Sequence, residues 1–417
     1  MSLLLVTLLA CSAVVTHGKA GYGPGEQDWG YVDVRPGAHM FYWLYYTTAN
    51  VSSYTERPLA IWLQEGPGTS STGFGNFKEL GPLDLKGNER NWTWVKDMNV
   101  LFIDSPVGSG FSYVDNATLY TTTNKEIALD LVEMMKGFYK LHPEFETVPL
   151  HIFSQSYGGK AAAEFALELY YAKERGELRS NITSVELGSP WVSPIDSILA
   201  WGPLLRELGI VDQDGFDAIM YSAKTTAQLV KQDNWIQAAI QCLHTQEEVR
   251  KASEGVDFYN TMKKTNLPED PEEEDAEVPL MKGPVSKILG IPEAVVYDLQ
   301  SDAVFYNQRA DFMKPVIHIV NELLEKTPLK VSVATGNLDL ICATPGNVNW
   351  IAKLEWSGKR EYLWAPRTTI NVDGILEGYQ KTGGNFTLFW INRSGHSIPA
   401  DNPAAMSHVL RQITSVG

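Results

Sequence analysis

One serine lies among small residues where an apolar strand pattern gives way to a helical pattern. The motif Ser154-Gln-Ser-Tyr-Gly-Gly159 follows the apolar run 150–153 and precedes a segment rich in Ala, Leu and Glu. A nucleophile elbow has this placement, because a tight strand-to-helix turn raises a serine hydroxyl above the sheet and tolerates small neighbours. The usual pattern is G-x-S-x-G, and Ser154 stands at its first position. The motif predicts Ser156 as a nucleophile, with an ordinary glycine-containing turn as the alternative.

A serine hydroxyl needs a histidine base and a carboxylate that orients the histidine. In the α/β-hydrolase order the acid follows the serine and the histidine comes last. Among eight histidines, His396 follows a late strand pattern, in the turn-like stretch Ser394-Gly-His-Ser-Ile-Pro399. Asp339 follows the apolar run 331–335. Chain order and placement at strand ends therefore predict a triad of Ser156, Asp339 and His396.

The elements that must position these residues alternate between strand and helix patterns. Most apolar runs are continuous, which is typical of strands buried on both faces of a mainly parallel sheet. Helical patterns follow several of them, as at 125–138 and 158–174. This alternation predicts an α/β fold with a mostly parallel central sheet flanked by helices. The strand-like runs lie at 41–46, 59–63, 100–103, 150–153, 184–187, 331–335 and 386–391.

The middle of the chain has few strand signals and is mainly helical, as at 214–231. We interpret residues 193–292 as an inserted helical cap that divides the core into 21–192 and 293–417. The run 268–277 is strongly acidic and is predicted to be a solvated loop, with a processing site or binding tail as the alternative. Residues 1–20 combine a short uncharged apolar run with small residues near Gly18 and Ala20, which is typical of a secretory signal peptide.

The composition limits the classes of partner. The 417 residues carry 34 Lys+Arg and 50 Asp+Glu, a net charge of −16, so nucleic acid and anionic lipid are poor candidates. After the signal peptide no run is long enough to span a membrane. Together with the signal peptide, the sequons support a secreted or lysosomal address. They begin at Asn50, Asn91, Asn116, Asn181, Asn385 and Asn392.

Several motifs spread along the chain resemble those of the serine carboxypeptidase family. The resemblance covers nearly the whole mature chain, less securely between 214 and 283. It implies an α/β-hydrolase fold with a helical insertion, and hydrolysis of the C-terminal peptide bond of peptides or proteins at acidic pH. The motifs are Trp62-Leu-Gln-Glu-Gly-Pro-Gly68, Gly73-Phe-Gly-Asn-Phe-Lys-Glu-Leu-Gly-Pro82, Asp104-Ser-Pro-Val-Gly-Ser-Gly-Phe-Ser-Tyr113, Ser154-Gln-Ser-Tyr-Gly-Gly159, Asp339-Leu-Ile-Cys342 and Gly395-His-Ser-Ile-Pro399.

The resemblance also implies roles for the backbone beside the nucleophile. Carried over by motif, Ser156 is the nucleophile, His396 the base and then acid, and Asp339 its orienter. The backbone N–H groups of Tyr157 and Gly66 would form the oxyanion hole. Two fixed donors stabilise the charge that develops on the carbonyl oxygen, and the loss of one such donor typically costs about 10²–10³ in rate.

The family holds the terminal carboxylate of its substrate with an Asn, a Gly and two glutamic acids that share a proton. A protonated carboxyl donates a hydrogen bond to a carboxylate, whereas an ionised one repels it, and this coupling accounts for an acidic optimum. The present chain departs from that pattern at three positions. Gln64 replaces the Asn, Glu65 replaces the Gly and Gln155 replaces one glutamic acid, while Glu79 matches the other.

These departures predict altered recognition of the carboxylate. Gln155 can donate without taking up a proton, which relaxes the need for low pH. Glu65 would weaken binding if its side chain points inward, because two like charges about 4 Å apart repel by about 4 kcal/mol at an effective dielectric near 20. The alternative is that Glu65 points to solvent, as most glutamates do.

The remaining signals concern cysteines and cofactors. Of three cysteines, Cys11 lies in the signal peptide, so Cys242 and Cys342 can form at most one bridge. Cys342 aligns with a free cysteine that many family members place beside the pocket, and a disulfide with Cys242 is the alternative. Thr69 stands where the family often has a cysteine. No spacing predicts a metal site or a nucleotide cofactor.

We therefore expect a serine-type carboxypeptidase that acts through an acyl-enzyme and uses no cofactor. An acyltransferase or esterase on the same triad is one alternative, because an alcohol can intercept the acyl-enzyme. A non-catalytic binding protein on a hydrolase scaffold is the other, because a fold does not guarantee chemistry.

Overall fold

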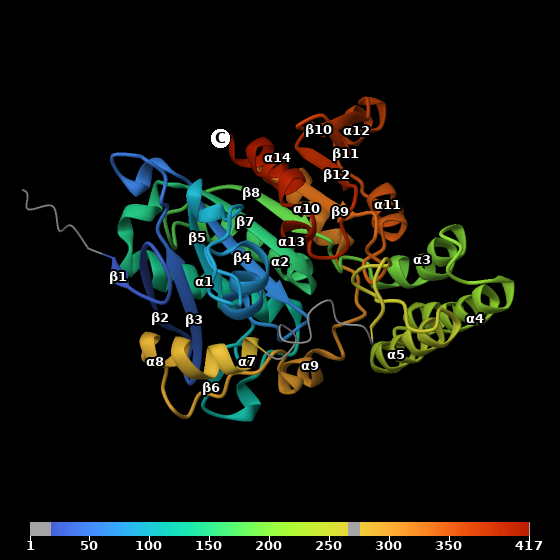
Figure 1. Ribbon diagram of the computed structural model, residues 1–417, viewed down its shortest axis with the longest axis horizontal. Coiled ribbons are helices and arrows are strands. Elements are labelled where there is room, and N and C mark those ends of the chain that lie inside the picture. Colours follow the sequence, from blue (N-terminus) through green and yellow to red (C-terminus); the bar gives the residue numbers. More distant parts are fainter. Residues whose placement is uncertain (1–17, 266–275, 417) are drawn as a thin grey trace, which may run out of the picture.

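A large twisted sheet runs through the molecule, with helices on both sides (Figure 1). The computed structural model describes residues 18–265 and 276–416, with the side chain of Glu65 left out. Most of the expected signal peptide and of the acidic loop 268–277 therefore lies outside the described residues.

The strand order is β1-β2-β3-β5-β4-β7-β8-β9-β12-β11-β10, and β6 pairs with β3. Pairing is parallel from β5 through β4, β7, β8 and β9 to β12, and antiparallel at both flanks. The carboxyl ends of these parallel strands meet at one edge of the sheet, where ligands bind in open α/β sheets. The strands are β1 (Lys19–Ala20), β2 (Glu26–Arg35), β3 (Ala38–Tyr45), β4 (Leu59–Glu65), β5 (Asn99–Ile103), β6 (Tyr113–Val114), β7 (Pro149–Ser156), β8 (Asn181–Gly188), β9 (Lys330–Gly336), β10 (Thr368–Val372), β11 (Ile375–Gly383) and β12 (Phe386–Ile391).

Helices cover the sheet through two hydrophobic clusters, one on each face. Along β3, Tyr42 and Leu44 belong to one cluster, whereas Phe41 and Trp43 belong to the other, as the alternation of a strand requires. The first cluster includes α1, α2 and α10, and the second includes α14. The longer helices are α1 (Asn124–Leu141), α2 (Tyr157–Glu174), α3 (Pro194–Glu207), α4 (Gln213–Lys231), α5 (Trp235–Ala252), α10 (Ile317–Lys326), α11 (Thr344–Ala352) and α14 (Pro403–Thr414).

Shorter helices occupy the connections. They are α7 (Glu277–Leu280), α8 (Ser286–Leu289), α9 (Asp302–Gln308), α12 (Lys359–Trp364) and α13 (Ile398–Asp401), the π-helices η2 (Ser71–Leu80) and η6 (Met281–Val285), and the 3₁₀ turns η1 (Tyr54–Glu56), η3 (Trp94–Lys96), η4 (Ala117–Leu119) and η5 (Pro143–Glu146). Of these, η2 matters most for function, because it follows β4 at the carboxyl edge of the sheet.

The predicted α/β-hydrolase fold is confirmed. All seven predicted strand runs lie in strands, and the helical patterns at 125–138 and 158–174 lie in α1 and α2. Local signals explain the start of α1, where Thr123 and Glu126 form a capping box and Ile127 begins a buried apolar stripe. The sequence analysis did not find β2, β10 and β11, whose apolar residues are interrupted by polar and glycine positions.

The described helices of residues 193–292 lie in two places (Figure 1). Helices α4 and α5 pack against each other and extend from one end of the molecule. Helices α7 and α8 lie elsewhere, beside β2, where the indole of Trp29 donates to the Leu289 carbonyl at 2.8 Å. The division of the chain into a core and one inserted cap stays a prediction.

Candidate active site

Ser156 occupies a strained turn between a strand and a helix. It is the last residue of β7 and the N-cap of α2, with φ of 62° and ψ of −126°. A non-glycine residue at positive φ stores strain of about 1–3 kcal/mol, and such strain concentrates at functional sites. The turn also needs small neighbours, since a Cβ at Gly159 would lie 2.6 Å from the Cβ of Pro190. This is the geometry of a nucleophile elbow.

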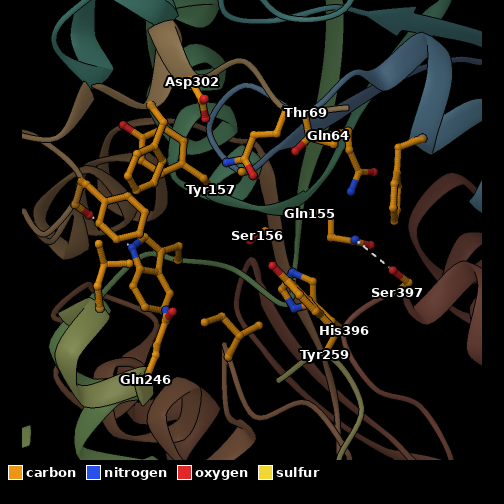
Figure 2. A pocket seen from close by; sticks show the side chains of 18 residues that line it. Gln64, Thr69, Gln155, Ser156, Tyr157, Gln246, Tyr259, Asp302, His396 and Ser397 are labelled. Carbon is orange, nitrogen blue, oxygen red and sulfur yellow. Dashed lines mark hydrogen bonds between the residues drawn. The ribbon is translucent and has the colours of Figure 1, made fainter. Parts of the chain in front are cut away.

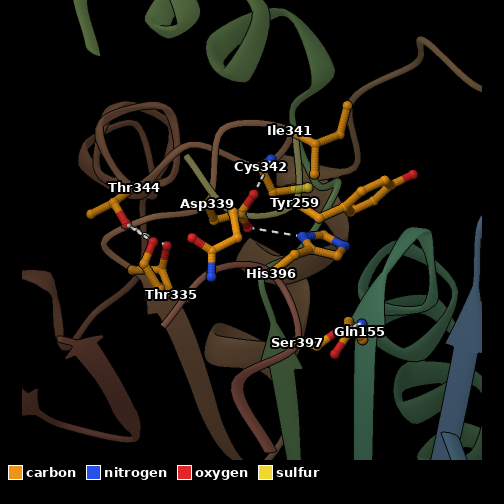
Figure 3. A network of polar contacts seen from close by, with 12 residues as sticks. Gln155, Tyr259, Thr335, Asp339, Ile341, Cys342, Thr344, His396 and Ser397 are labelled. Carbon is orange, nitrogen blue, oxygen red and sulfur yellow. Dashed lines mark hydrogen bonds and ion pairs between the residues drawn. The ribbon is translucent and has the colours of Figure 1, made fainter. Parts of the chain in front are cut away.

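His396 and Asp339 form a buried pair at the same edge of the sheet (Figure 3). Nδ1 of His396 lies 2.9 Å from Oδ2 of Asp339, and Oδ1 of Asp339 accepts the Cys342 backbone N–H at 3.0 Å. The His396 backbone N–H donates to the Tyr259 carbonyl at 2.7 Å, which anchors the loop. Burial opposes the imidazolium charge, but the Asp339 carboxylate outweighs it and raises the pKa of His396 above 6.5.

Ser156 and His396 line one cavity of about 570 Å³ (Figure 2). Gln64, Gln155 and Tyr157 line it too, together with Gly66. A second cavity of about 270 Å³ adjoins it and is lined by Glu79. The two cavities share Phe74, Tyr259 and Ser397. The structure thus brings the predicted site residues together, with Asp339 behind His396 and the side chain of Glu65 outside the described part.

The amide of Gln64 has a defined orientation. Its oxygen accepts the indole N–H of Trp62 at 2.9 Å, and its backbone N–H donates to Ser71 at 2.9 Å. Because the oxygen is engaged by a donor, the amide nitrogen remains as the group that can donate into the cavity.

Gln155, Glu79 and Ser397 form a hydrogen-bonded group on one side of Ser156. Nε2 of Gln155 donates to Oε1 of Glu79 at 2.8 Å and to the Ser397 hydroxyl at 3.2 Å. Oε2 of Glu79 is buried and has no hydrogen-bond partner of normal geometry among the described residues. Burial raises the pKa of Glu79 to about 7, against the opposing effect of the Gln155 amide. Glu79 is therefore mostly protonated below neutral pH.

Two backbone N–H groups border the nucleophile. Tyr157 is the first residue of α2, so its backbone N–H lies at the N-terminus of the helix, where N–H groups point away from the helix. Gly66 follows β4, the neighbour of β7 in the sheet. A Cβ at Gly66 would lie 2.8 Å from Nε2 of Gln300 and from the Thr69 hydroxyl, so a larger residue would have to displace these side chains.

Cys242 and Cys342, the cysteines in the described part of the chain, are free and buried. Burial, followed by the Asp339 charge, raises the pKa of Cys342 well above its usual value, while the Ser156 hydroxyl acts in the opposite sense. Among the described residues, Asp339, Cys342 and His396 have potential ligand atoms within 4.8 Å of one another. The bond between Asp339 and His396 already accounts for this proximity.

The sequence analysis did not identify the aromatic wall of the cavity. The rings of Tyr157 and Phe312 are parallel, with centroids 6.1 Å apart, and Trp191 and Phe305 each lie 5.4 Å from Phe312. Tyr157 begins α2, Phe305 lies in α9 (Asp302–Gln308), and Trp191 and Phe312 lie outside the helices and strands, so no local pattern relates them. Ser397 was also missed, although its place next to His396 was a usable signal.

Comparisons with known proteins agree on one family. A family model described as serine carboxypeptidase matches residues 19–415. The retinoid-inducible serine carboxypeptidase of Rattus norvegicus is 38% identical, over 94% of this chain and 92% of that protein. Serine carboxypeptidase-like 51 of Arabidopsis thaliana is 34% identical, over 99% of this chain and 97% of that protein.

A solved structure supports the fold. The crystal structure of Kex1Δp, a prohormone-processing carboxypeptidase from Saccharomyces cerevisiae, is similar with a TM-score of 0.83 and 19% identity. The likeness covers 94% of this chain and 91% of that one. Within the residues that the structure describes, no helix is both long and apolar enough to cross a bilayer.

Proposed function

The chain belongs to the serine carboxypeptidase family and is a serine-type carboxypeptidase, and from this premise we propose that Ser156, His396 and Asp339 are its catalytic triad. The observation that supports this assignment best is the buried 2.9 Å contact between His396 and Asp339, at a cavity that Ser156 also lines. Family membership favours peptide hydrolysis over the acyltransferase, esterase and non-catalytic alternatives.

In the proposed mechanism, Oγ of Ser156 attacks the carbonyl carbon of the last peptide bond while Nε2 of His396 accepts the hydroxyl proton. The Asp339 carboxylate holds Nδ1–H and stabilises the imidazolium. The backbone N–H groups of Gly66 and Tyr157 donate to the oxyanion of the tetrahedral intermediate.

Collapse of that intermediate breaks the C–N bond. His396 gives its proton to the leaving amine, and the C-terminal amino acid departs from an acyl-Ser156 ester. A water molecule then loses a proton to His396 and attacks the ester, which releases the shortened peptide and restores the Ser156 hydroxyl.

We further propose that Gln64, Gln155 and Glu79 hold the terminal carboxylate of the substrate. The amide nitrogen of Gln64 is a donor at every pH. Glu79 can donate from Oε2 only while it is protonated, and its pKa of about 7 extends that state to near-neutral pH. Gln155 acts mainly by holding Oε1 of Glu79, which leaves Oε2 as the donor. Carboxylate recognition would then persist to higher pH than with two coupled glutamic acids.

The effect of Glu65 on carboxylate binding stays a prediction. The backbone of Glu65 pairs with Ser156 across β4 and β7, which places the residue beside the site. If its side chain points inward, Glu65→Gly should lower KM for peptides with a free carboxylate and leave KM for C-terminally amidated analogues unchanged. If it points to solvent, both values should stay the same.

A fluorophosphonate probe tests the nucleophile without requiring knowledge of the substrate. We expect the probe to label the wild-type protein at Ser156 and to leave Ser156→Ala unlabelled. Ser154→Ala is a matched control in the same motif and should retain labelling, because the Ser154 hydroxyl donates to the Glu186 carbonyl and not to the cavity. Wild-type protein that remains unlabelled, or labelling of Ser156→Ala, would exclude the proposed nucleophile.

We also propose secretion or delivery to the lysosome, with glycans on the exposed sequons. Asn385 and Asn392 are half-buried and donate their amide nitrogens to backbone carbonyls, at 3.1 Å and 3.2 Å. A glycan needs space around the amide nitrogen that a half-buried side chain does not have. Mass spectrometry of glycopeptides should therefore find both unmodified, and full occupancy of either would contradict the proposal. The exposed sequons begin at Asn50, Asn91, Asn116 and Asn181.

A further inference from the structure

Helix α5 carries an apolar stripe that faces solvent. Ile236, Ile240 and Leu243 are each exposed by 42–49% of their surface. At about 100° per residue, these three positions fall within about 60° of one another around the helix axis, so their side chains form one stripe. Their exposure is unusual for three large aliphatic side chains on one face of a helix.

The fold already uses a different face of α5. Ala238, Ala239, Cys242 and Val249 are buried, and α5 packs against α4 and α3. The helix thus has two apolar faces, and packing within the chain covers one of them. Packing of α5 against α4 and α3 accounts for the buried apolar face of α5 but not for the exposed stripe.

The part of α5 that carries the stripe is also uncharged. From Trp235 to Gln246 the helix has no Asp, Glu, Lys or Arg, although the chain as a whole has a net charge of −16. The neighbouring helix α4 differs, because it exposes Asp214, Asp217 and Lys224. An uncharged, apolar surface favours an apolar and uncharged ligand.

The stripe is continuous with the catalytic cavity. Leu243 and Gln246 line the cavity, and Ile236 lies two turns farther along the helix from Leu243. Figure 2 shows Gln246 on the opposite side of Ser156 from Gln155 and Ser397. A substrate whose carboxylate lies beside Gln155 would therefore extend its acyl portion toward α5. At a rise of 1.5 Å per residue the stripe is about 10 Å long, which matches about three residues of extended peptide.

We propose that Ile236, Ile240 and Leu243 bind apolar side chains of the substrate peptide upstream of the bond that is cleaved. The inference rests on the proposed function, because the proposed active site sets the direction in which the bound substrate peptide runs. It names a substrate class: peptides with an uncharged, apolar segment beginning about three residues before the C-terminus. Such peptides gain contacts that a dipeptide is too short to make.

The test compares peptide substrates of different length. N-blocked dipeptides occupy the active site alone, while heptapeptides with the same last two residues extend over α5. We expect the wild-type kcat/KM to be about tenfold higher for a heptapeptide with Leu at the third to fifth positions from the C-terminus than for one with Asp there, mainly through KM. In Ile236→Glu and Ile240→Glu this preference should fall about tenfold, because the introduced carboxylate would lose hydration when the apolar segment packs on it.

Leu363→Glu is a matched control, since Leu363 is 57% exposed and lies on α12. It should keep the wild-type preference. An unchanged preference in both α5 variants, with dipeptides still cleaved, would overturn this inference alone. Failure of the wild-type protein to cleave dipeptides would overturn the proposed function, and this inference with it. A lower mass of the α5 variants by light scattering, with an unchanged preference, would show that the stripe binds a second copy of the chain and would also overturn the inference.

Discussion

Two buried carboxyl groups approach His396 from different sides, and their surroundings differ. Asp339 has partners at both oxygens: Oδ2 contacts Nδ1 of His396 and Oδ1 accepts the Cys342 N–H. Glu79 has a partner at Oε1, the amide of Gln155, while its buried Oε2 has none within the described chain. Of the two, Glu79 is the carboxyl that burial favours in the protonated form.

This difference shows how one site uses the same functional group for two tasks. A carboxylate beside an imidazole stabilises positive charge during proton transfer. A carboxyl that burial keeps neutral can instead donate a hydrogen bond to another carboxylate. The pKa of about 7 for Glu79 implies that the second task depends on pH near neutrality.

Asp339→Asn should cause the largest loss. The amide keeps the shape of the side chain but cannot stabilise the imidazolium, and it favours the wrong tautomer of His396. In serine hydrolases such a change lowers kcat by about 10³–10⁴, with little effect on KM. Steady-state assays with a good peptide substrate will measure this. Retention of more than a tenth of the wild-type kcat would contradict the role assigned to Asp339.

Glu79→Gln should change the pH dependence rather than abolish activity. In the wild type, Glu79 loses its proton as the pH rises through about 7, so KM for free-carboxylate peptides should rise about tenfold per pH unit above that value. The glutamine cannot ionise, and KM should stay flat. At acidic pH Glu79 is already mostly neutral in the wild type, so the fall of kcat/KM there should change little in the variant.

Glu89→Gln, at an exposed position, is the control. Its KM above pH 7 and its kcat/KM at acidic pH should vary with pH as in the wild type. C-terminally amidated peptides supply a second control, because they lack the carboxylate that an ionised Glu79 repels. If KM rises above pH 7 in Glu79→Gln as it does in the wild type, another group governs carboxylate binding.

Gln155→Glu restores the pair of glutamic acids that the family uses. Two adjacent carboxyls titrate as a coupled pair, so one of them ionises at lower pH and places a negative charge beside the substrate carboxylate. We expect KM to rise about tenfold at pH 7 and much less at pH 5, where protons are more available. Gln155→Met removes the amide without adding a charge and separates loss of the hydrogen bonds from gain of charge. Equal KM values for Gln155→Glu at both pH values would refute the coupling.

The sequence alone led to the assignment of the catalytic half of this comparison, which stays a prediction. Ser156, Asp339 and His396 each follow a strand, and strands buried in a parallel sheet are recognisable because their apolar runs are continuous. Since the carboxyl ends of such strands meet at one edge, residues far apart in the chain could be assigned to one site. The strands at the flanks were missed for the opposite reason: β2, β10 and β11 have polar and glycine interruptions that hide them.

For the proposed carboxylate-binding residues, the sequence predicted which residues to expect but not which hydrogen bonds join them. The motifs led us to expect Gln64, Glu79 and Gln155 beside the substrate carboxylate, and this stays a prediction. They did not show that Gln155 donates to Glu79, because η2 brings Glu79 there from 76 residues away. Side-chain pairing of this kind depends on tertiary packing, and so does the burial that raises the pKa of Glu79.

Glu186 is a third buried carboxyl to compare with Asp339 and Glu79. Its substitution should have the smallest effect on activity. Glu186 is fully buried on β8, its Oε1 has no partner in the described chain, and it lines a small cavity with Gln155 and His396. Burial raises its pKa from 4.5 to about 8, against opposing hydrogen bonds from the Ser154 and Ala334 backbone. Between these pH values the unfolded chain releases the proton while the folded chain keeps it, so the free energy of unfolding should fall as the pH rises.

Glu186→Gln removes this linkage, because its amide is neutral in both states. Urea unfolding at several pH values from 4.5 to 8 should therefore give a shallower decline for Glu186→Gln than for the wild type, with kcat/KM at pH 6 within about threefold. Exposed Glu174→Gln should keep the wild-type slope. Parallel slopes for all three proteins would mean that Glu186 ionises in the folded state at ordinary pH. Burial without a partner would then be insufficient to hold a proton in this site, and the contrast between Asp339 and Glu79 would need a different cause.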